Sequence, residues 1–223
     1  MIFRLVRNAA WWIADYAYAA VWQVRALFSR TDPGDFGSGD GTPIVVLPGV
    51  YETWRFLQPL ITELHDRGHP VHVITALGRN RWPVPRAAGH VAEYLRRHDL
   101  DDVVIVAHSK GGLVGKQVMA DAAVGSRVRG MVAVASPFAG SVYGRLMLVP
   151  TLRAFSPSAP GILALAREAA PNAHIVSVYG EFDPHIPGGS ELEGARNVRL
   201  ETGGHFRILA HPRVIAEVVR LAE

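Results

Sequence analysis

The sequence contains no cysteine, and this absence excludes disulfide bonds, thiolate nucleophiles and metal sites built from Cys ligands. It also lacks an uncharged apolar run of the ~20 residues that a membrane-spanning helix needs. No basic run occurs, and 23 Lys and Arg against 20 Asp and Glu leave a net charge of only +3. The sequence therefore gives no sign of a nucleic-acid-binding protein.

What the sequence does have is a high apolar content, 49% of its 223 residues, which argues against disorder and fits one compact domain. Short, β-branched apolar runs alternate with segments of helical periodicity from Pro43 onward. Such runs are typical of strands buried on both faces, so we expect an α/β fold with a doubly wound, mostly parallel sheet over residues 43–223. The predicted strands are Ile44–Leu47, Val71–Ile74, Val103–Val106, Val128–Ala135, Ile175–Tyr179 and Val198–Leu200.

Residues 1–30 have the periodicity of one amphipathic helix. Its apolar side carries Leu5, Ala9, Ile13, Tyr16, Ala20, Val24 and Leu27. Its polar side carries Arg4, Arg7, Asn8, Asp15, Gln23 and Arg25, together with Trp11, Tyr18 and Trp22, whose rings would suit a membrane interface.

Three interpretations of this helix stay open: a helix docked on the domain, a peripheral membrane helix, and a signal peptide whose apolar stretch Asp15 interrupts. Residues 31–42 are rich in Gly and Asp and read as a linker.

A strand–turn–helix pattern at Val103–Gly112 predicts a nucleophile. The buried strand leads into Ser109, and two glycines follow it at the start of a helix. Such a turn strains the serine backbone and needs small neighbours two residues away, a condition that Ala107 and Gly111 meet. The free amides of the helix start would favour negative charge at the same point.

A serine nucleophile needs a base and a carboxylate that orients the base. In this type of sheet the chain order is serine, acid, histidine, at loops that follow the strands. His205 follows a glycine pair after the last predicted strand and is the expected base. Asp183 follows the preceding strand and is the expected acid, with Glu181 in the same loop as the alternative.

Two backbone amides are expected to form an oxyanion hole. One belongs to Lys110, the residue after the nucleophile, and the other to the loop after the first strand, where Val50 is the first candidate and Tyr51 the second. The Lys110 side chain is expected to be exposed, either solvated or attracting anionic head groups. This chemistry needs no metal and no organic cofactor.

Four stretches together carry a resemblance to the α/β-hydrolases, and more narrowly to the small bacterial triacylglycerol lipases and their esterase relatives. They are Ile44–Val50, Ala107–Gly111, Ser136–Ser141, and Ser190–Val198 followed by Gly204 and His205. The resemblance spans Pro43 to Glu223 and leaves residues 1–42 outside it. Ala107 stands where the superfamily has Gly, as it does in the smallest bacterial lipases. The sequence departs from the family pattern at Pro48 and Phe138, which stand where His is usual, and at Lys110, where Met or Gln is common. These departures bear on the substrate more than on the chemistry.

The resemblance implies a serine esterase or lipase that acts on a small-molecule ester, lipid-like, through an acyl-enzyme. Alternatives are an acyltransferase, thioesterase or amidase with the same three residues, or a non-catalytic binding protein with this fold. Tyr51, His108, Phe138 and His185 are the expected pocket residues.

Residues 138–172 form either a lid or acyl pocket, through Leu146, Met147, Leu148, Phe155, Ile162 and Leu163, or a packed surface excursion. We expect a cytoplasmic protein, with peripheral membrane contact through residues 1–30 or secretion as open alternatives.

Overall fold

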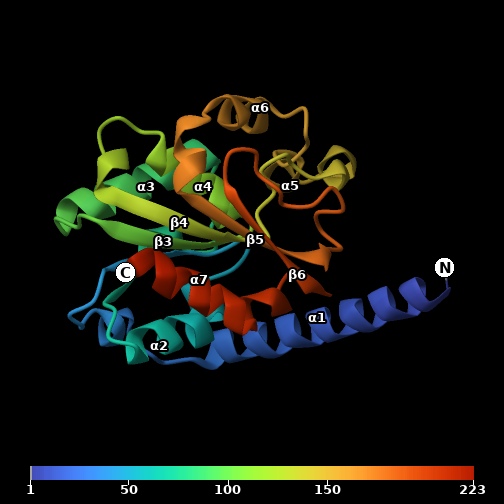
Figure 1. The fold of residues 1–223 in the computed structure, drawn as a ribbon, viewed down its shortest axis with the longest axis horizontal. Coiled ribbons are helices and arrows are strands. Elements are labelled where there is room, and N and C mark those ends of the chain that lie inside the picture. The colour runs from blue at the N-terminus through green and yellow to red at the C-terminus, as the bar shows by residue number, and fades with distance from the viewer. Residues whose placement is uncertain (1) are drawn as a thin grey trace.

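The computed structural model describes residues 2–223 and has one sheet of six parallel strands in the order β2-β1-β3-β4-β5-β6 (Figure 1). The predicted α/β architecture is therefore confirmed. The strands are β1 (Ile44–Leu47), β2 (Val71–Val73), β3 (Val103–His108), β4 (Val128–Val134), β5 (Ile175–Phe182) and β6 (Arg196–Gly203).

Helices cover both faces of the sheet, as the continuous apolar strands require. One apolar core lies between the sheet and α2 (Gln58–Asp66) and α7 (Pro212–Ala222). The other lies between the sheet and α3 (Val84–Arg97), α4 (Lys110–Met119) and α6 (Pro160–Arg167). Figure 1 shows these two layers on opposite sides of the strands.

Helix α4 begins at Lys110, directly after the nucleophile, as the strand–turn–helix pattern predicts. Two segments differ from the sequence prediction. Strand β5 continues to Phe182, so that it ends immediately before the candidate acid. The expected linker contains a 3-10 helix, η1 (Pro33–Phe36), whose Phe36 packs edge-on against Trp54 in the core.

Helix α1 (Ile2–Phe28) lies along the α2–α7 side of the molecule, and its first turns project beyond the rest of the fold (Figure 1). Its predicted polar side faces the domain: Asp15 is fully buried, and Tyr18 and Trp22 pack against the core. The expectation that these rings meet a membrane interface is therefore wrong. Of the helices within residues 2–223, none is both long enough and apolar enough to cross a bilayer.

Candidate active site

Ser109 lies in the sharp turn between β3 and α4, in the unusual backbone conformation that the elbow pattern predicts. Its φ is 51° and its ψ is −118°, a region that costs a non-glycine residue about 1–3 kcal/mol. The turn needs a small residue at Gly111, because a Cβ there would lie 2.3 Å from the carbonyl oxygen of Leu47. The turn therefore places Ser109 between the end of β3 and the start of α4, where it lines a cavity.

The structure brings Ser109, His205 and Asp183 together in one hydrogen-bonded chain. The Ser109 Oγ lies 3.0 Å from Nε2 of His205, and Nδ1 of the same ring lies 2.8 Å from Oδ2 of Asp183. Phe182 and Gly203 pair across β5 and β6, which brings the two loops after these strands side by side. All three side chains are buried or nearly so. This spacing permits a proton to pass from the hydroxyl to the imidazole.

Asp183 is held as a carboxylate by its surroundings. Its Oδ1 accepts hydrogen bonds from the amides of His185, at 2.7 Å, and Ile186, at 3.0 Å. Burial acts to raise the pKa of Asp183, but His205 and the amide of His185 outweigh it and hold that pKa below its ordinary value. Glu181, the alternative acid, instead forms an ion pair with Arg7 of α1 at 3.2 Å.

The backbone amides of Lys110 and Val50 are the two expected to form an oxyanion hole. Neither has a hydrogen-bond partner within residues 2–223. The amide of Tyr51, the second candidate, donates to the carbonyl of Arg79 at 2.8 Å. The amide of Gly49 donates to Glu52 Oε2 at 2.7 Å. Val50 is therefore the residue of this loop whose amide is left to bind a ligand.

The Lys110 side chain is buried, and the expectation that it is exposed is wrong. Its Nζ donates to the backbone carbonyls of Asn80, at 2.7 Å, and of Trp82. Burial lowers the pKa of Lys110 to about 8. Asn80 in turn donates from its side-chain amide to the carbonyl of Pro48 at 2.7 Å. Lys110 thus braces the loop that leads to Val50 and does not attract head groups.

His108 is also buried, and it lines no part of the cavity that contains Ser109, contrary to the prediction. Its Nδ1 lies 2.9 Å from Glu52 Oε2, and its Nε2 lies 2.9 Å from the backbone carbonyl of His205. Both ring nitrogens face oxygen atoms, an arrangement that favours the doubly protonated, charged form of the ring. Burial acts to lower the pKa of His108, but Glu52 and the carbonyl outweigh it and raise that pKa above its ordinary value.

Asp15 of α1 binds the other side of the His205 backbone. Its carboxylate accepts hydrogen bonds from three successive amides, those of His205 at 2.9 Å and of Phe206 and Arg207 at 2.8 Å. The approach needs glycine at Gly204, because φ is 120° there and a Cβ would lie 2.5 Å from Asp15 Oδ1. The loop that carries the imidazole is therefore anchored by a helix from the opposite end of the chain.

A cavity of about 520 Å³ opens at the Ser109 hydroxyl. Tyr51 and His185 line it as predicted, whereas Phe138 is 5% exposed and belongs to the apolar core, so that prediction is wrong. The hydroxyl of Tyr16 on α1 lies 3.0 Å from Nε2 of His185. Burial and the neighbouring His205 lower the pKa of His185 to about 4, so this ring is neutral at pH 7.

The segment 138–172 is divided between the two roles considered for it. Six of its residues line the Ser109 cavity, with more apolar than polar surface in the cavity as a whole: Ser141, Tyr143, Gly144, Met147, Leu152 and Phe155. Ile162 and Leu165 of α6 are instead buried in the core. The cavity thus lies between this segment and α1, with the candidate nucleophile at its base.

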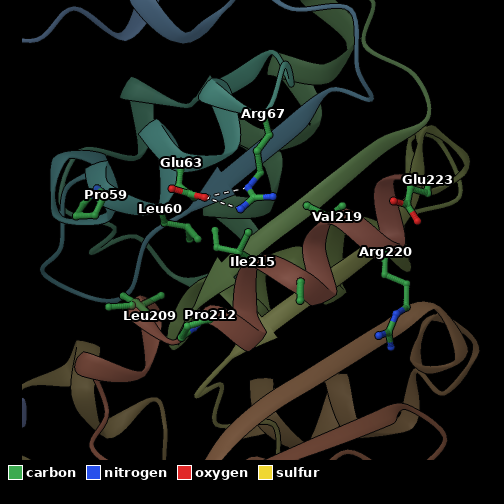
Figure 2. Close-up of a pocket in the computed structure, with 12 residues that line it drawn as sticks. Pro59, Leu60, Glu63, Arg67, Leu209, Pro212, Ile215, Val219, Arg220 and Glu223 are labelled. Carbon is green, nitrogen blue, oxygen red and sulfur yellow. Dashed lines mark hydrogen bonds and ion pairs between the residues drawn. The ribbon is translucent and has the colours of Figure 1, made fainter.

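A larger hollow of about 660 Å³ lies between α2 and α7, and it contains none of these residues (Figure 2). Figure 2 shows apolar side chains such as Leu60 and Ile215 along it, with the Glu63–Arg67 ion pair beside them. Nowhere in residues 2–223 do three or more His, Asp or Glu side chains lie close enough to hold a metal ion.

Three residues of the site were not predicted from the sequence: Asp15, Glu52 and Asn80. Asp15 gave one signal, since it is the only acid in the first 30 residues and interrupts an apolar stretch. Glu52 lies three residues after Gly49 in the loop expected to hold the oxyanion, where a buried carboxylate has no sequence signature. Asn80 lies in a loop without regular periodicity, and nothing there indicated its burial.

Comparison with known proteins identifies the fold of this chain but no family or close relative. No model of a protein family matches the sequence, and no match was found among curated proteins. Among solved structures, the chain is similar to the mature form of the Bacillus licheniformis lipase BlEst2, with a TM-score of 0.67 and 15% identity over 86% of this chain and 100% of that one. It is also similar to a monoacylglycerol lipase of Paleococcus ferrophilus, with a TM-score of 0.59 and 18% identity over 84% and 96% of the two chains.

A third similar structure is an extracellular α/β-hydrolase of a Paenibacillus species, with a TM-score of 0.57 and 18% identity over 81% of this chain and 98% of that one. Together with the parallel sheet and the strained serine turn, these likenesses show that the chain has the α/β-hydrolase fold.

Proposed function

We propose that the protein is a serine hydrolase that cleaves carboxylic esters with apolar acyl chains through an acyl-enzyme on Ser109. The observation that carries the proposal is the hydrogen-bonded chain from Ser109 through His205 to Asp183, at 3.0 and 2.8 Å. The similarity to a lipase and a monoacylglycerol lipase is in keeping with it.

In the first half of the reaction, Ser109 Oγ attacks the ester carbonyl carbon while Nε2 of His205 takes the hydroxyl proton. The amides of Val50 and Lys110 donate to the oxyanion of the tetrahedral intermediate, and the start of α4 favours the same negative charge. The leaving alcohol then takes the proton from His205. Asp183 keeps the ring oriented and stabilises its charged form.

In the second half, a water molecule attacks the acyl carbonyl and gives its proton to His205, which returns it to Ser109 as the acid leaves. The largely apolar lining of the cavity, from Met147, Leu152 and Phe155, supports an acyl chain as the group bound beside Ser109. Tyr51 and His185 give the same cavity polar edges, which can accommodate the alcohol part of the ester.

The test is hydrolysis of p-nitrophenyl esters from short to long chain, together with labelling by a fluorophosphonate. We expect Ser109→Ala to abolish labelling and to lower turnover by about 10⁴-fold or more, because no hydroxyl remains to form the acyl-enzyme. The exposed Ser126→Ala is the matched control and should behave as the unmodified protein.

A Ser109→Ala protein with full esterase activity would overturn the proposal, and a folded protein that fluorophosphonate never labels would favour a binding protein. Product analysis with alcohol, amine and thioester reactants separates hydrolysis from acyl transfer, thioesterase and amidase activity.

A further inference from the structure

Helix α1 presents its apolar side to solvent and its polar side to the domain, the reverse of an ordinary docked helix. The side that faces the domain carries the buried Asp15 and Arg7, which pairs with Glu181. The opposite side leaves large apolar side chains exposed, among them Leu5 at 63%, Ile13 at 64% and Leu27 at 66%. Hydrogen bonds, the Arg7–Glu181 ion pair and the packing of Tyr18 and Trp22 therefore dock α1, while most of its apolar stripe stays exposed.

A second exposed apolar segment lies across the cavity mouth from this stripe. Leu146 and Leu148 are 77% and 93% exposed. Within residues 2–223, all exposed large apolar side chains except Trp82 and Leu163 belong to α1 or to residues 142–149. We call this set the apolar rim: Ile2, Phe3, Leu5, Val6, Trp12, Ile13, Tyr16, Val21, Val24, Leu27, Phe28, Val142, Tyr143, Leu146, Met147, Leu148 and Val149.

The apolar rim reaches the Ser109 cavity from both of its segments, through three of its residues. Tyr16 of α1 lines the cavity and lies beside Trp12 at a ring distance of 4.7 Å. Tyr143 and Met147 line the cavity from the opposite segment. A flat apolar body resting on the apolar rim would therefore cover the opening that leads to Ser109.

The charges around the apolar rim favour one kind of occupant. Residues 2–30 and 138–160 contain one acidic side chain, Asp15, which is fully buried. Five exposed side chains in these two segments are positively charged: Arg4, Arg25, Arg30, Arg145 and Arg153. A second copy of the chain would bring these like charges together, whereas anionic lipid head groups would complement them.

We propose that the apolar rim rests on the surface of an anionic phospholipid bilayer, with the mouth of the Ser109 cavity facing the lipid. A helix of 27 residues, about 40 Å long, with one apolar side and basic flanks lies in the plane of such an interface. Trp12 and Tyr16 suit the level of the head groups. Only the entry of a lipid ester into the cavity rests on the proposed function, since attachment to the bilayer needs no catalysis.

The experiment measures co-sedimentation of the full chain with vesicles, using the Ser109→Ala protein so that no result depends on catalysis. The vesicles contain phosphatidylcholine alone or phosphatidylcholine with about 30% phosphatidylglycerol. The anionic lipid gives the second kind of vesicle a negative surface potential. We expect binding to the phosphatidylglycerol vesicles, at least tenfold weaker binding to phosphatidylcholine alone, and a decrease as salt is raised.

Two substitutions on opposite sides of the cavity mouth test the surface itself. Ile13→Glu and Leu148→Glu should each weaken binding about tenfold or more, because a carboxylate replaces an apolar contact in an anionic interface. Leu163→Glu, at a side chain 45% exposed but outside the apolar rim, is the matched control and should bind as before. Circular dichroism and the unfolding temperature establish that each variant is folded.

The inference is overturned if the folded Ser109→Ala protein fails to bind either vesicle, or if Ile13→Glu and Leu148→Glu bind as well as Leu163→Glu. A dimer in solution that both substitutions disrupt, without vesicle binding, would also overturn it in favour of a second copy. If the vesicles bind the protein but the unmodified protein with Ser109 intact has no esterase activity, this inference stands and only the proposed function is contradicted.

Discussion

The Asp15 carboxylate accepts a hydrogen bond from the backbone amide of His205 at 2.9 Å, although 190 residues separate them in the chain. The His205 carbonyl meanwhile accepts from His108 at 2.9 Å. Both polar groups of the His205 backbone are therefore bound by buried, ionisable side chains. Hydrogen bonds to charged groups contribute about 1.5–3 kcal/mol each, which is enough to fix the imidazole opposite Ser109.

Asp15→Asn should lower kcat by about 10- to 100-fold while the KM for a short soluble ester changes little. The amide nitrogen of asparagine turns a donor toward backbone N–H groups, so the His205 loop shifts, and small displacements of a catalytic group are costly. Steady-state kinetics on p-nitrophenyl acetate measure the effect, with the exposed Asp40→Asn as control. A lower unfolding temperature with unchanged kcat would show that Asp15 stabilises the fold without positioning His205.

Asp183→Asn should lower kcat by about 10⁴-fold, whereas Glu181→Gln should change it less than threefold, roughly the effect of losing a surface ion pair. The reason is that Asp183, and not Glu181, contacts the His205 ring, at 2.8 Å, while Glu181 pairs with Arg7. Single-turnover kinetics on the two variants distinguish the residues. The assignment of the acid would be reversed if Glu181→Gln were the inactive one.

Much of the fold and of the candidate site could be predicted, because short patterns of neighbouring residues in the sequence indicate both. Buried β-branched runs identify parallel strands, and the strand–Ser–Gly-Gly pattern identifies the turn at Ser109. Among ten histidines, the glycine pair marked His205, whose ring lies 3.0 Å from the Ser109 hydroxyl oxygen. The structure gives the reason, since a Cβ at Gly203 would lie 2.4 Å from Trp11 and one at Gly204 would meet Asp15.

The contacts of α1 could not be predicted in the same way. Periodicity shows which residues share one side of a helix, but not which side docks. In α1 the polar side docks because Asp15 finds three free amides in a loop that is distant in sequence. The burial of Lys110 and His108 likewise depends on the Asn80 and Glu52 loops, whose positions only the folded chain defines.

His185 should make the protein more sensitive to acid. Its pKa is lowered to about 4 in the folded chain from 6.5, so between these values the unfolded chain binds the extra proton. Stability is therefore lost as the pH falls from about 6.5 toward 4. His185→Gln should reduce this fall in the unfolding temperature by about 5 °C, while the exposed His174→Gln should not. Scanning calorimetry at pH 4.5 and 7 measures it, and equal acid sensitivity in both variants would contradict the assignment.

The buried pair of Glu52 and His108 should have the opposite pH dependence. The pKa of His108 is raised in the folded chain, so the stability it contributes is present below about 6.5, its unfolded value, and is lost as the pH rises through the raised value. Glu52→Gln removes the carboxylate that raises this pKa and gives the amide of Gly49 a neutral acceptor in place of a charged one. The variant should be less stable than the unmodified protein by about 1–3 kcal/mol at pH 6, and the difference should shrink toward pH 9.

Urea unfolding of both proteins across this pH range measures the difference and cancels the titration of groups that the two proteins share. Glu63→Gln, which breaks an exposed ion pair with Arg67, is the control and should show a small difference at every pH. A difference for Glu52→Gln that stays constant with pH would mean that His108 is neutral, and that Glu52 rather than the ring carries the proton between them. In that case an uncharged His108 ring would bind the carbonyl of His205. Its hydrogen bond would be weaker than that of a charged ring, so the His205 loop would be held mainly by Asp15.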